Sequence, residues 1–382
     1  MKRIYLDYGA TTPVDPRVVE AMLPYFTETF GNPSSIHAFG REARTALEQA
    51  RMTLARWLGA RESEICFVSG GTEANNLALQ GAAHQYRQKG HHIITTPVEH
   101  KGVLKTCQML EKEGFQVTYL PVDEHGRVDP EAVREALRPE TILVSIIHGN
   151  NEIGTLNPIA EIGRITREAG VLFHTDAVQS FGKVPIQVEK MHIDLLSLSG
   201  HKIYGPKGVG ALYIRRGIAL RPLLHGGSHE NNRRAGTENL PGIVGLAKAA
   251  ELIHKEMDTL ARQVGELRDY LREQLVQRFE VRINGHPTER LYNNLNVSFI
   301  GCDAHALLLN LDMRGIAVST GSACSSGTVE PSEVLKALGL SDALATSAIR
   351  FTLGRHTTRE EIDATVEALE EIVPRLQKER RR

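Results

Sequence analysis

The feature that most constrains the fold of this sequence is a regular alternation, from residue 65 to residue 175, of short apolar runs with amphipathic stretches. The apolar runs predict strands at residues 65–69, 92–96, 115–120, 142–147 and 172–175. The stretches between them have a helical period and predict helices at residues 73–88, 101–113, 130–137 and 159–169. Repeated units of this kind predict a mostly parallel sheet with helices on both faces. Ligands of such sheets bind at the carboxyl ends of the strands, so we expect the chemistry in the loops that follow them.

The chain after residue 254, together with the first residues, predicts a second, smaller α/β domain. The chain opens with a short strand and turn at residues 4–13, followed by helices at residues 15–29 and 40–58. After residue 254 we predict a long helix to residue 279, strands at 281–283, 295–299 and 348–353, a helix at 304–313 and a charged helix at the end. The expected organisation is a large domain over residues 15–254 and a small domain formed by residues 1–14 and 255–382.

Composition and charge exclude several classes of protein. Among 382 residues, 45 Lys and Arg balance 46 Asp and Glu, which argues against a general binder of nucleic acids or membrane surfaces. No apolar run reaches the length of about 18 residues that a membrane span needs, and the N-terminal residues are too polar for a signal peptide. The four cysteines form no Cys-x-x-Cys pair and the 16 histidines are scattered, so we expect neither a disulfide scaffold nor a metal site. A reducing, cytoplasmic setting is expected.

A glycine-rich segment at residues 194–210 contains a candidate catalytic lysine. Its apolar run ends in small hydroxyl residues, which predicts a strand that delivers its last residues to a loop. Lys202 lies at the exit of this strand, close to Ser199 and His201, which can both donate hydrogen bonds to an anion. Such a lysine suggests a Schiff base with pyridoxal phosphate, the most common covalent use of a lysine amine. On these residues alone, the alternative is a surface lysine in a glycine-rich turn.

The loops after other strands carry residues that suit a phosphate or an aromatic ring. Residues 69–76 place two glycines and Thr72 at the start of a helix, where free N–H groups and the positive helix end favour a phosphate. His100 follows the next strand on the same rim. Asp176 directly follows a strand, and its charge would keep a pyridine nitrogen protonated. The structural alternatives are a helix cap for the glycine turn and for Asp176, and a structural role for His100.

A series of short motifs runs through the chain in a fixed order. They occupy residues 6–13 (LDYGATTP), 30–35 (FGNPSS), 70–76 (GGTEANN), 150–154 (NNEIG), 174–179 (HTDAVQ), 199–202 (SGHK) and 321–327 (GSACSSG). Together they resemble the NifS/IscS-type cysteine desulfurases, pyridoxal-phosphate enzymes of the class V aminotransferase group. The resemblance covers nearly the whole chain. It implies fold type I, an α/β large domain with a mostly parallel sheet of the seven-stranded type flanked by helices, plus a smaller α/β domain.

The resemblance also implies roles for individual residues. Lys202 would bind the cofactor covalently and later move the substrate α-proton, with His100 stacked on the ring and active in acid–base steps. Asp176 would pair with the pyridine nitrogen, and Gln179 would hydrogen-bond the phenolic oxygen. The residues assigned to the phosphate are Gly71, Thr72, Ser199 and His201. Asn151, the second of two adjacent amides after a strand, would contact the cofactor or the substrate.

Two further residues are implied for the site. In the family a threonine of the second subunit reaches the phosphate, and in this sequence that residue is Thr237, within the motif RAGTEN. The resemblance therefore implies a homodimer with shared sites. Arg350 alternates with apolar neighbours in a predicted strand and should point off the sheet face. The family pattern supports a bidentate grip on the substrate carboxylate, and a structural ion pair is the alternative.

Cys324 is the candidate nucleophile. It lies in a run of Ser, Thr, Gly and Ala over residues 319–328, the composition of a mobile, solvated loop. Cys66 lies in an apolar strand and Cys107 on a helix, where we expect inert buried thiols, and no motif supports Cys302. A nucleophilic cysteine has to reach the substrate sulfur as a thiolate and carry a persulfide away. A flexible loop suits both tasks.

Two features depart from the family pattern. Gly9 stands where many relatives have alanine or asparagine beside the cofactor. The chain also stops soon after its last helix, whereas the iron–sulfur housekeeping members extend further and bind their scaffold with that extension. The resemblance therefore leaves the usual scaffold partner open.

The function expected from these observations is that of a homodimeric cysteine desulfurase, which converts L-cysteine to L-alanine and holds the sulfur as a persulfide on Cys324. The sulfur would pass to a protein acceptor, such as an iron–sulfur scaffold or a sulfurtransferase, for iron–sulfur cluster assembly, other thio-cofactors or tRNA thiolation. No metal, nucleic acid or membrane partner is expected. Two alternatives stay open: a selenocysteine lyase or other class V pyridoxal-phosphate enzyme, and a sulfur-delivery hub that acts chiefly by binding.

Overall fold

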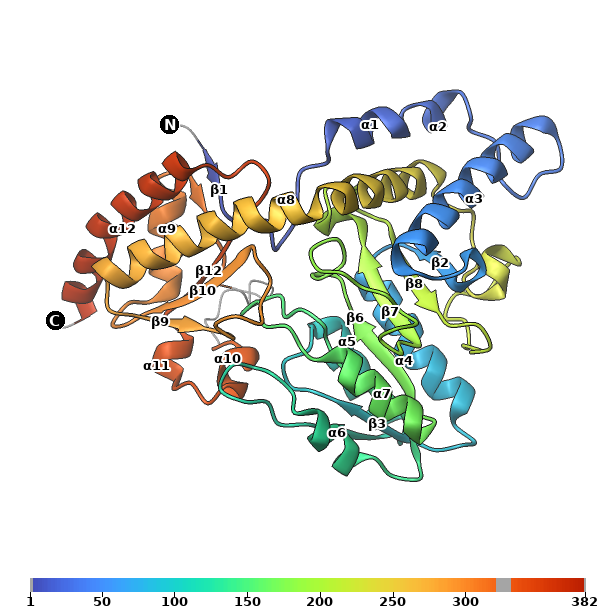
Figure 1. Cartoon of the computed structure of the whole chain (residues 1–382), viewed down its shortest axis with the longest axis horizontal. Coiled ribbons are helices and arrows are strands. Elements are labelled where there is room, and N and C mark those ends of the chain that lie inside the picture. The colour runs from blue at the N-terminus through green and yellow to red at the C-terminus, as the bar shows by residue number, and fades with distance from the viewer. Residues whose placement is uncertain (1–2, 321–330, 381–382) are drawn as a thin grey trace.

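The computed structural model describes residues 3–320 and 331–380 and is organised around a seven-stranded sheet (Figure 1). In spatial order its strands are β2 (Ile65–Val68), β8 (Gly210–Ile214), β7 (Leu195–Ser199), β6 (Leu172–Asp176), β5 (Thr141–Ser145), β3 (His92–Thr95) and β4 (Gln116–Tyr119). Neighbouring strands are parallel except that β8 runs antiparallel to both β2 and β7. The predicted mostly parallel sheet is therefore confirmed.

Helices cover both faces of this sheet because alternate side chains of each strand point to opposite sides. In β2, Ile65 and Phe67 join an apolar core with α3 (Ala38–Leu58), α7 (Ile159–Ala169) and α8 (Leu240–Arg278). Cys66 and Val68 join a second core with α4 (Gly71–Tyr86) and α5 (Lys101–Lys112). The remaining helix of this region, α6 (Pro130–Ala136), packs against α7. Strands buried on both faces are apolar throughout, which explains the continuous apolar runs in the sequence.

A smaller sheet lies at the other end of the molecule (Figure 1). Its antiparallel strands follow the order β12 (Ala348–Thr352), β10 (Asn294–Phe299) and β9 (Val281–Asn284). The helices of this part are α9 (Ala304–Asp312), α10 (Glu333–Ala337), α11 (Asp342–Ala345) and α12 (Arg359–Arg380). The N-terminal strand β1 (Ile4–Tyr5) pairs in parallel with β11 (Ile316–Ala317), so the first residues of the chain join this smaller part.

The longest helix, α8, differs most from its prediction. It has 39 residues and begins at Leu240, whereas the sequence predicts a long helix only after residue 254. Asn239 caps its start by accepting a hydrogen bond from the Gly242 N–H, and a proline in the first turn suits the helix start. The helix passes both sheets (Figure 1). Because it runs through residue 254, the division into residues 15–254 and 255–382 stays a prediction.

The N-terminal helical segment also differs from its prediction. The single helix predicted at residues 15–29 is two short helices, α1 (Pro16–Met22) and α2 (Pro24–Thr27). Pro24 has no N–H with which to continue the first helix, so the second one starts there. No helix within residues 3–320 and 331–380 is long and apolar enough to cross a membrane.

Candidate functional site

Lys202 lies at the carboxyl edge of the large sheet, just after β7. Ser199 ends that strand in a buried position, and a short 3-10 helix over Gly200–Lys202 then turns the chain. The Lys202 Nζ donates hydrogen bonds to the carbonyl oxygens of Gly9 and Ala10, both at 2.7 Å. The lysine therefore reaches from the large sheet to the N-terminal segment.

The loop that carries Lys202 also fixes this N-terminal segment. The Thr12 N–H and hydroxyl donate to the carbonyl oxygen of His201 at 2.9 and 3.0 Å, and the Thr12 hydroxyl accepts from the Tyr204 N–H at 2.9 Å. His201 Nδ1 lies 3.2 Å from the Thr11 hydroxyl. Burial, together with the nearby Lys202, lowers the pKa of His201 to about 4. At neutral pH this ring is therefore uncharged and serves as a hydrogen-bonding group.

Asp176 ends β6 at the same edge and is almost fully buried. One carboxylate oxygen accepts a hydrogen bond from the Val178 N–H at 2.9 Å and so closes a local turn. The other accepts from Nδ2 of Asn75, a buried residue of α4, at 2.6 Å. Asn75 thus orients the carboxylate, and the sequence reasoning gave it no role. The sequence feature that could have identified Asn75 is an amide side chain on the buried face of a helix, where the helical period favours an apolar side chain.

The glycine turn between β2 and α4 lies beside the end of β7. A Cβ on Gly71 would stand 2.6 Å from Cγ2 of Val178, so no larger residue fits there. A Cβ on Gly70 would lie 3.8 Å from the Ser199 hydroxyl, which places the two strand exits side by side. Thr72 is exposed in the first turn of α4. The start of α4, with its free N–H groups, therefore lies beside the Ser199 hydroxyl, an arrangement that suits an anion.

His100 lies next to the pair of Asn75 and Asp176. Its Nδ1 accepts a hydrogen bond from the Gly102 N–H at 3.0 Å and so caps α5, which is the structural role left open by the sequence. A Cβ on Gly102 would lie 3.1 Å from His100 Nδ1 and 3.7 Å from Asn75 Nδ2. Because Nδ1 accepts this hydrogen bond, Nε2 is the ring nitrogen that can act as a donor. The ring itself is exposed.

The two adjacent amides after β5 have different environments. Asn150 is buried, and its side chain bonds the backbone of Val98, Glu152 and Ile153 at 2.8 to 3.0 Å. Asn151 is only partly buried, and its backbone carbonyl oxygen accepts a hydrogen bond from Arg350 Nη1 at 2.8 Å. The first amide side chain therefore shapes the loop, while the backbone of the second residue binds Arg350.

Arg350 lies on β12 and is 4% exposed. Its Nη2 forms an ion pair with Asp7 at 2.8 Å, and its backbone pairs with Ser319. A Cβ on Gly9 would lie 3.4 Å from the Arg350 Cζ, so the guanidinium stands beside the residue that binds Lys202. The ion pair that the sequence left as an alternative is thus present, at a position next to the lysine.

Thr237 is exposed on a segment that two ion pairs hold against α3 and α4. The buried carboxylate of Glu230 binds both terminal nitrogens of Arg51 on α3, each at 2.8 Å. Arg234 pairs at 3.0 Å with Glu73, in the first turn of α4. Residues 230–232 all have positive φ, between 47° and 62°, a conformation that non-glycine residues adopt only at a cost. The buried ion pair therefore fixes a strained backbone that leads to Thr237.

The structure brings most of the predicted residues to one edge of the large sheet. Gln179 joins them, because its Nε2 donates to the same Gly9 carbonyl oxygen as Lys202, at 2.8 Å. Cys324 lies outside the described residues. The three described cysteines, Cys66, Cys107 and Cys302, are all buried. Within the described ranges no group of three or more His, Cys, Asp or Glu side chains could hold a metal ion.

Comparison with known proteins gives a consistent result. The model of the family "Aminotransferase class-V" matches residues 4–365. "Cysteine desulfurase IscS" of Dictyoglomus turgidum is 54% identical over 378 residues, which cover 98% of this chain and 96% of that protein. The solved structure "NIFS-LIKE PROTEIN" is 40% identical with a TM-score of 0.93 and covers 98% of this chain and 100% of its own. The structure "SspA in complex with cysteine" is 41% identical with a TM-score of 0.84 and covers 94% and 100%.

Proposed function

Because this chain belongs to the cysteine desulfurases of the class V aminotransferase family, which depend on pyridoxal phosphate, we propose that it converts L-cysteine to L-alanine and retains the sulfur as a persulfide on Cys324. The observation that carries the proposal is the convergence of Lys202, Asp176 and Gln179 on one edge of a fold type I sheet. A solved relative described as a complex with cysteine supports the choice of substrate.

The described residues fit pyridoxal phosphate. A lysine amine, a buried carboxylate, an amide donor and a glycine turn at a helix start match the aldehyde, pyridine nitrogen, phenolic oxygen and phosphate of the cofactor. Asp176 is already buried and oriented by Asn75, and the turn at Gly71 leaves no space for a Cβ. When bound, the cofactor supplies an aldehyde that bonds to an amine and a ring that accepts the electron pair of a bond broken at the substrate α-carbon.

We assign the cofactor-binding roles residue by residue. With the cofactor bound, Lys202 would bond to the aldehyde carbon and move the substrate α-proton, Asp176 would bind the pyridine nitrogen and Gln179 would donate to the phenolic oxygen. His100 covers the ring face and has Nε2 available for proton transfer. The phosphate would be held by Gly71, Thr72, Ser199 and His201, with Thr237 of the partner subunit. Asn151 and Arg350 would bind the substrate.

Cys324 carries the sulfur step in this proposal. Its thiolate attacks the sulfur of L-cysteine, so a sulfur–sulfur bond forms and the bond from sulfur to the substrate β-carbon breaks. The electron pair of that bond stays with the carbon, which takes up a proton and becomes the methyl group of alanine. The enzyme is left with a persulfide, which a protein acceptor with a thiol can remove.

The direct test is to identify the products from L-cysteine. Purified protein loaded with pyridoxal phosphate should form alanine and, with a thiol reductant present, one sulfide for each alanine. Pyruvate in place of alanine would contradict the proposal, since it would show elimination of the sulfur without its transfer to the enzyme.

Arg350→Lys is expected to raise the KM for L-cysteine about 10- to 100-fold, with the cofactor content unchanged. The reason is that a lysine ammonium cannot grip a carboxylate with two parallel N–H groups, and a charge-assisted hydrogen bond contributes roughly 1.5–3 kcal/mol. Steady-state kinetics and the cofactor absorbance measure the two quantities separately.

The control for Arg350 is Asp7→Asn, which removes the charge of its ion-pair partner and keeps the guanidinium. If Arg350 binds substrate, Asp7→Asn raises the KM much less than Arg350→Lys does. If the ion pair is only structural, both variants lower the melting temperature alike and neither changes the KM selectively, and that result would exclude Arg350 from the substrate site.

A homodimer is supported by exposed apolar side chains in the segment from α1 to α3. They are Val19, Leu23, Phe26, Phe30, Ile36, Phe39 and Met52, of which Ile36 is 91% exposed. Monomeric proteins rarely expose so many large apolar side chains in one segment. This segment forms one outer edge of the molecule (Figure 1). A second copy packed there would cover it.

Combining Phe30→Glu with Ile36→Glu is therefore expected to convert the dimer to a monomer, because two charges would have to be buried at the interface. Sedimentation velocity measures the change. Met313→Glu is the matched control, since Met313 is 82% exposed on a different part of the surface, at the end of α9. A double variant that keeps the wild-type mass would show that this segment is not the interface.

A further inference from the structure

Lys183 is a buried lysine, 7% exposed, to which the proposed mechanism gives no role. It follows the loop that carries Asp176 and Gln179, and its Nζ donates to the backbone oxygen of Gln179 at 2.8 Å and to Gln179 Oε1 at 3.2 Å. No carboxylate pairs with it in the part of the chain that the structure describes. Burial of an amine without a counter-ion destabilises the folded state, so the presence of Lys183 here calls for a functional explanation.

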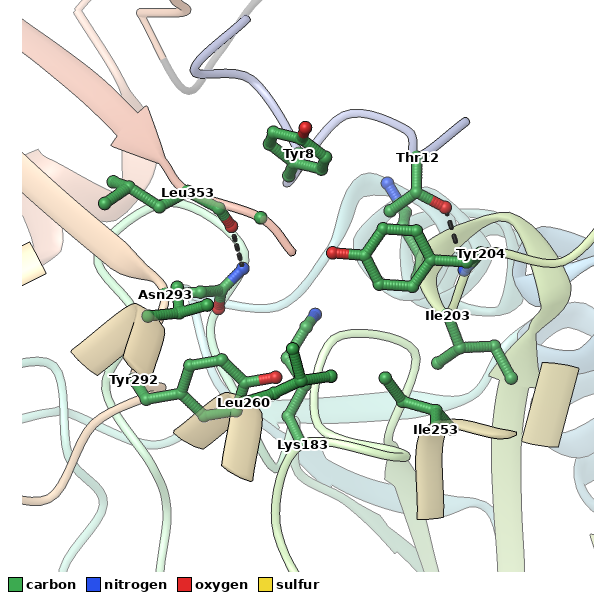
Figure 2. Close-up of a pocket in the computed structure, with 13 residues that line it drawn as sticks. Tyr8, Thr12, Lys183, Ile203, Tyr204, Ile253, Leu260, Tyr292, Asn293 and Leu353 are labelled. Carbon is green, nitrogen blue, oxygen red and sulfur yellow. Dashed lines mark hydrogen bonds between the residues drawn. The ribbon is translucent and has the colours of Figure 1, made fainter. Parts of the chain in front are cut away.

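The amine borders a small cavity beneath the candidate site. This cavity has a volume of about 10 Å³ and is also lined by Lys202. Figure 2 shows the Lys183 side chain pointing into the space bounded by Tyr8, Tyr204 and Tyr292, which with Lys202 are the other titratable residues of the lining. Burial raises the pKa of these tyrosines, so they stay uncharged at neutral pH. Burial and the nearby Lys202 lower the pKa of Lys183 to about 7.

The hydrogen bonds of Gln179 allow only one orientation of its amide. Oε1 accepts from Lys183, and Nε2 donates to the carbonyl oxygen of Gly9 at 2.8 Å. A flipped amide would place Oε1 against the Gly9 oxygen, two acceptors with no hydrogen between them. The Gly9 oxygen and Lys183 therefore select the same orientation, and Lys183 holds the Oε1 end of the amide so that Nε2 faces Gly9 and Lys202.

This orientation matters because Lys202 and Gln179 bind the same Gly9 oxygen and so lie side by side. In pyridoxal phosphate the phenolic oxygen is attached to the ring carbon next to the one that bears the aldehyde. Lys202 bonds the aldehyde in the proposed site, so the Gln179 amide beside it would meet the phenolic oxygen. This oxygen is an acceptor and needs a hydrogen-bond donor. Only the Nε2 end of the Gln179 amide can supply one.

We propose that Lys183 is a positioning residue that holds the Gln179 amide with its N–H donors toward the phenolic oxygen of the cofactor. The proposal rests on the cofactor site assigned above. It gives the buried amine a function that a methionine of similar length could not perform, because a thioether donates no hydrogen bond.

The test is a pH titration of the absorbance of the protein loaded with pyridoxal phosphate. A donor at the phenolic oxygen stabilises the deprotonated form of the bound cofactor. Loss of the donor therefore raises the midpoint of the titration, the pH at which half of the cofactor is deprotonated. Lys183→Met is expected to raise it by about 0.5–1 pH unit, and Gln179→Met by a similar amount. The control Lys190→Met, at an exposed lysine, should leave it unchanged.

The double variant separates positioning from a direct effect of the lysine charge. If Lys183 acts through Gln179, the midpoint of Lys183→Met with Gln179→Met equals that of Gln179→Met alone. Additive shifts, or no shift in Lys183→Met, would overturn the inference. Lys183→Gln is a second variant that keeps an N–H donor without the charge, and its midpoint should lie closer to that of wild type. A midpoint equal to that of Lys183→Met would count against the inference. A wild type that binds no cofactor would instead contradict the proposed function.

Discussion

Lys202→Ala is expected to leave a folded protein that no longer holds pyridoxal phosphate covalently and no longer forms alanine from L-cysteine. The amine of Lys202 has two tasks in the proposed mechanism, the bond to the cofactor and the movement of the α-proton. Loss of a positioned proton-transfer group alone lowers rates by roughly 100- to 10,000-fold. The remaining contacts of Asp176, Gln179 and the phosphate-binding residues are untouched, so noncovalent cofactor is expected to remain.

The measurement is mass spectrometry after borohydride reduction, which makes the lysine–cofactor bond permanent. Wild type should carry the added mass on the peptide that contains Lys202, and Lys202→Ala should carry none. Lys207→Ala is the matched control, because Lys207 lies in the same loop but is exposed. Cofactor found on another lysine of the wild type, or a wild type that stays colourless after reconstitution, would refute the assignment.

The architecture was predictable because one pattern encodes it. Strands buried on both faces read as near-continuous apolar runs, and the amphipathic stretches between them can cover a sheet only as helices. The start of α8 at Leu240 was not predictable in the same way. Its first turns lie against α1 and α3, and this packing extends the helix through a stretch with a weak periodic signal.

The candidate site was predictable where its residues follow strands directly. Parallel strands deliver their carboxyl ends to one edge, so Asp176, His100 and Lys202 had to come close whatever the lengths of the intervening helices. The residues that position them were not predictable. Asn75 lies 101 positions from Asp176 in the sequence, and Arg51 lies 179 positions from Glu230. Such pairs are set by tertiary packing, which a local pattern does not encode.

The buried cysteines sharpen the assignment of the nucleophile. Burial raises the pKa of the Cys66 thiol well above its usual range and that of Cys107 to about 12. Neither forms a thiolate at neutral pH, and only a thiolate attacks sulfur at a useful rate. Cys302 is buried as well, so substrate cannot reach it. The burial of these three cysteines is consistent with the proposal that Cys324, which lies outside the described residues, carries the sulfur.

Cys324→Ala is expected to bind pyridoxal phosphate and L-cysteine like wild type while its alanine production falls by roughly 100-fold or more, the scale of losing a positioned catalytic group. Lys202, Asp176 and Arg350 are unchanged, so the absorbance should still respond when L-cysteine is added. Cys324→Ser should do no better, because a hydroxyl is a far weaker nucleophile at neutral pH. The two halves of the reaction are thereby separated in one variant.

Labelling with radioactive-sulfur cysteine locates the persulfide directly. Wild type should acquire label that a thiol reductant removes, and Cys324→Ala should acquire none. Cys66→Ala, Cys107→Ala and Cys302→Ala are the matched controls, and each should keep the label because its thiol is buried away from the substrate. Reducible label on Cys324→Ala would show that another residue carries the sulfur. A control variant that loses the label while keeping its fold and cofactor would identify that residue, since removal of an inert buried thiol cannot stop sulfur transfer.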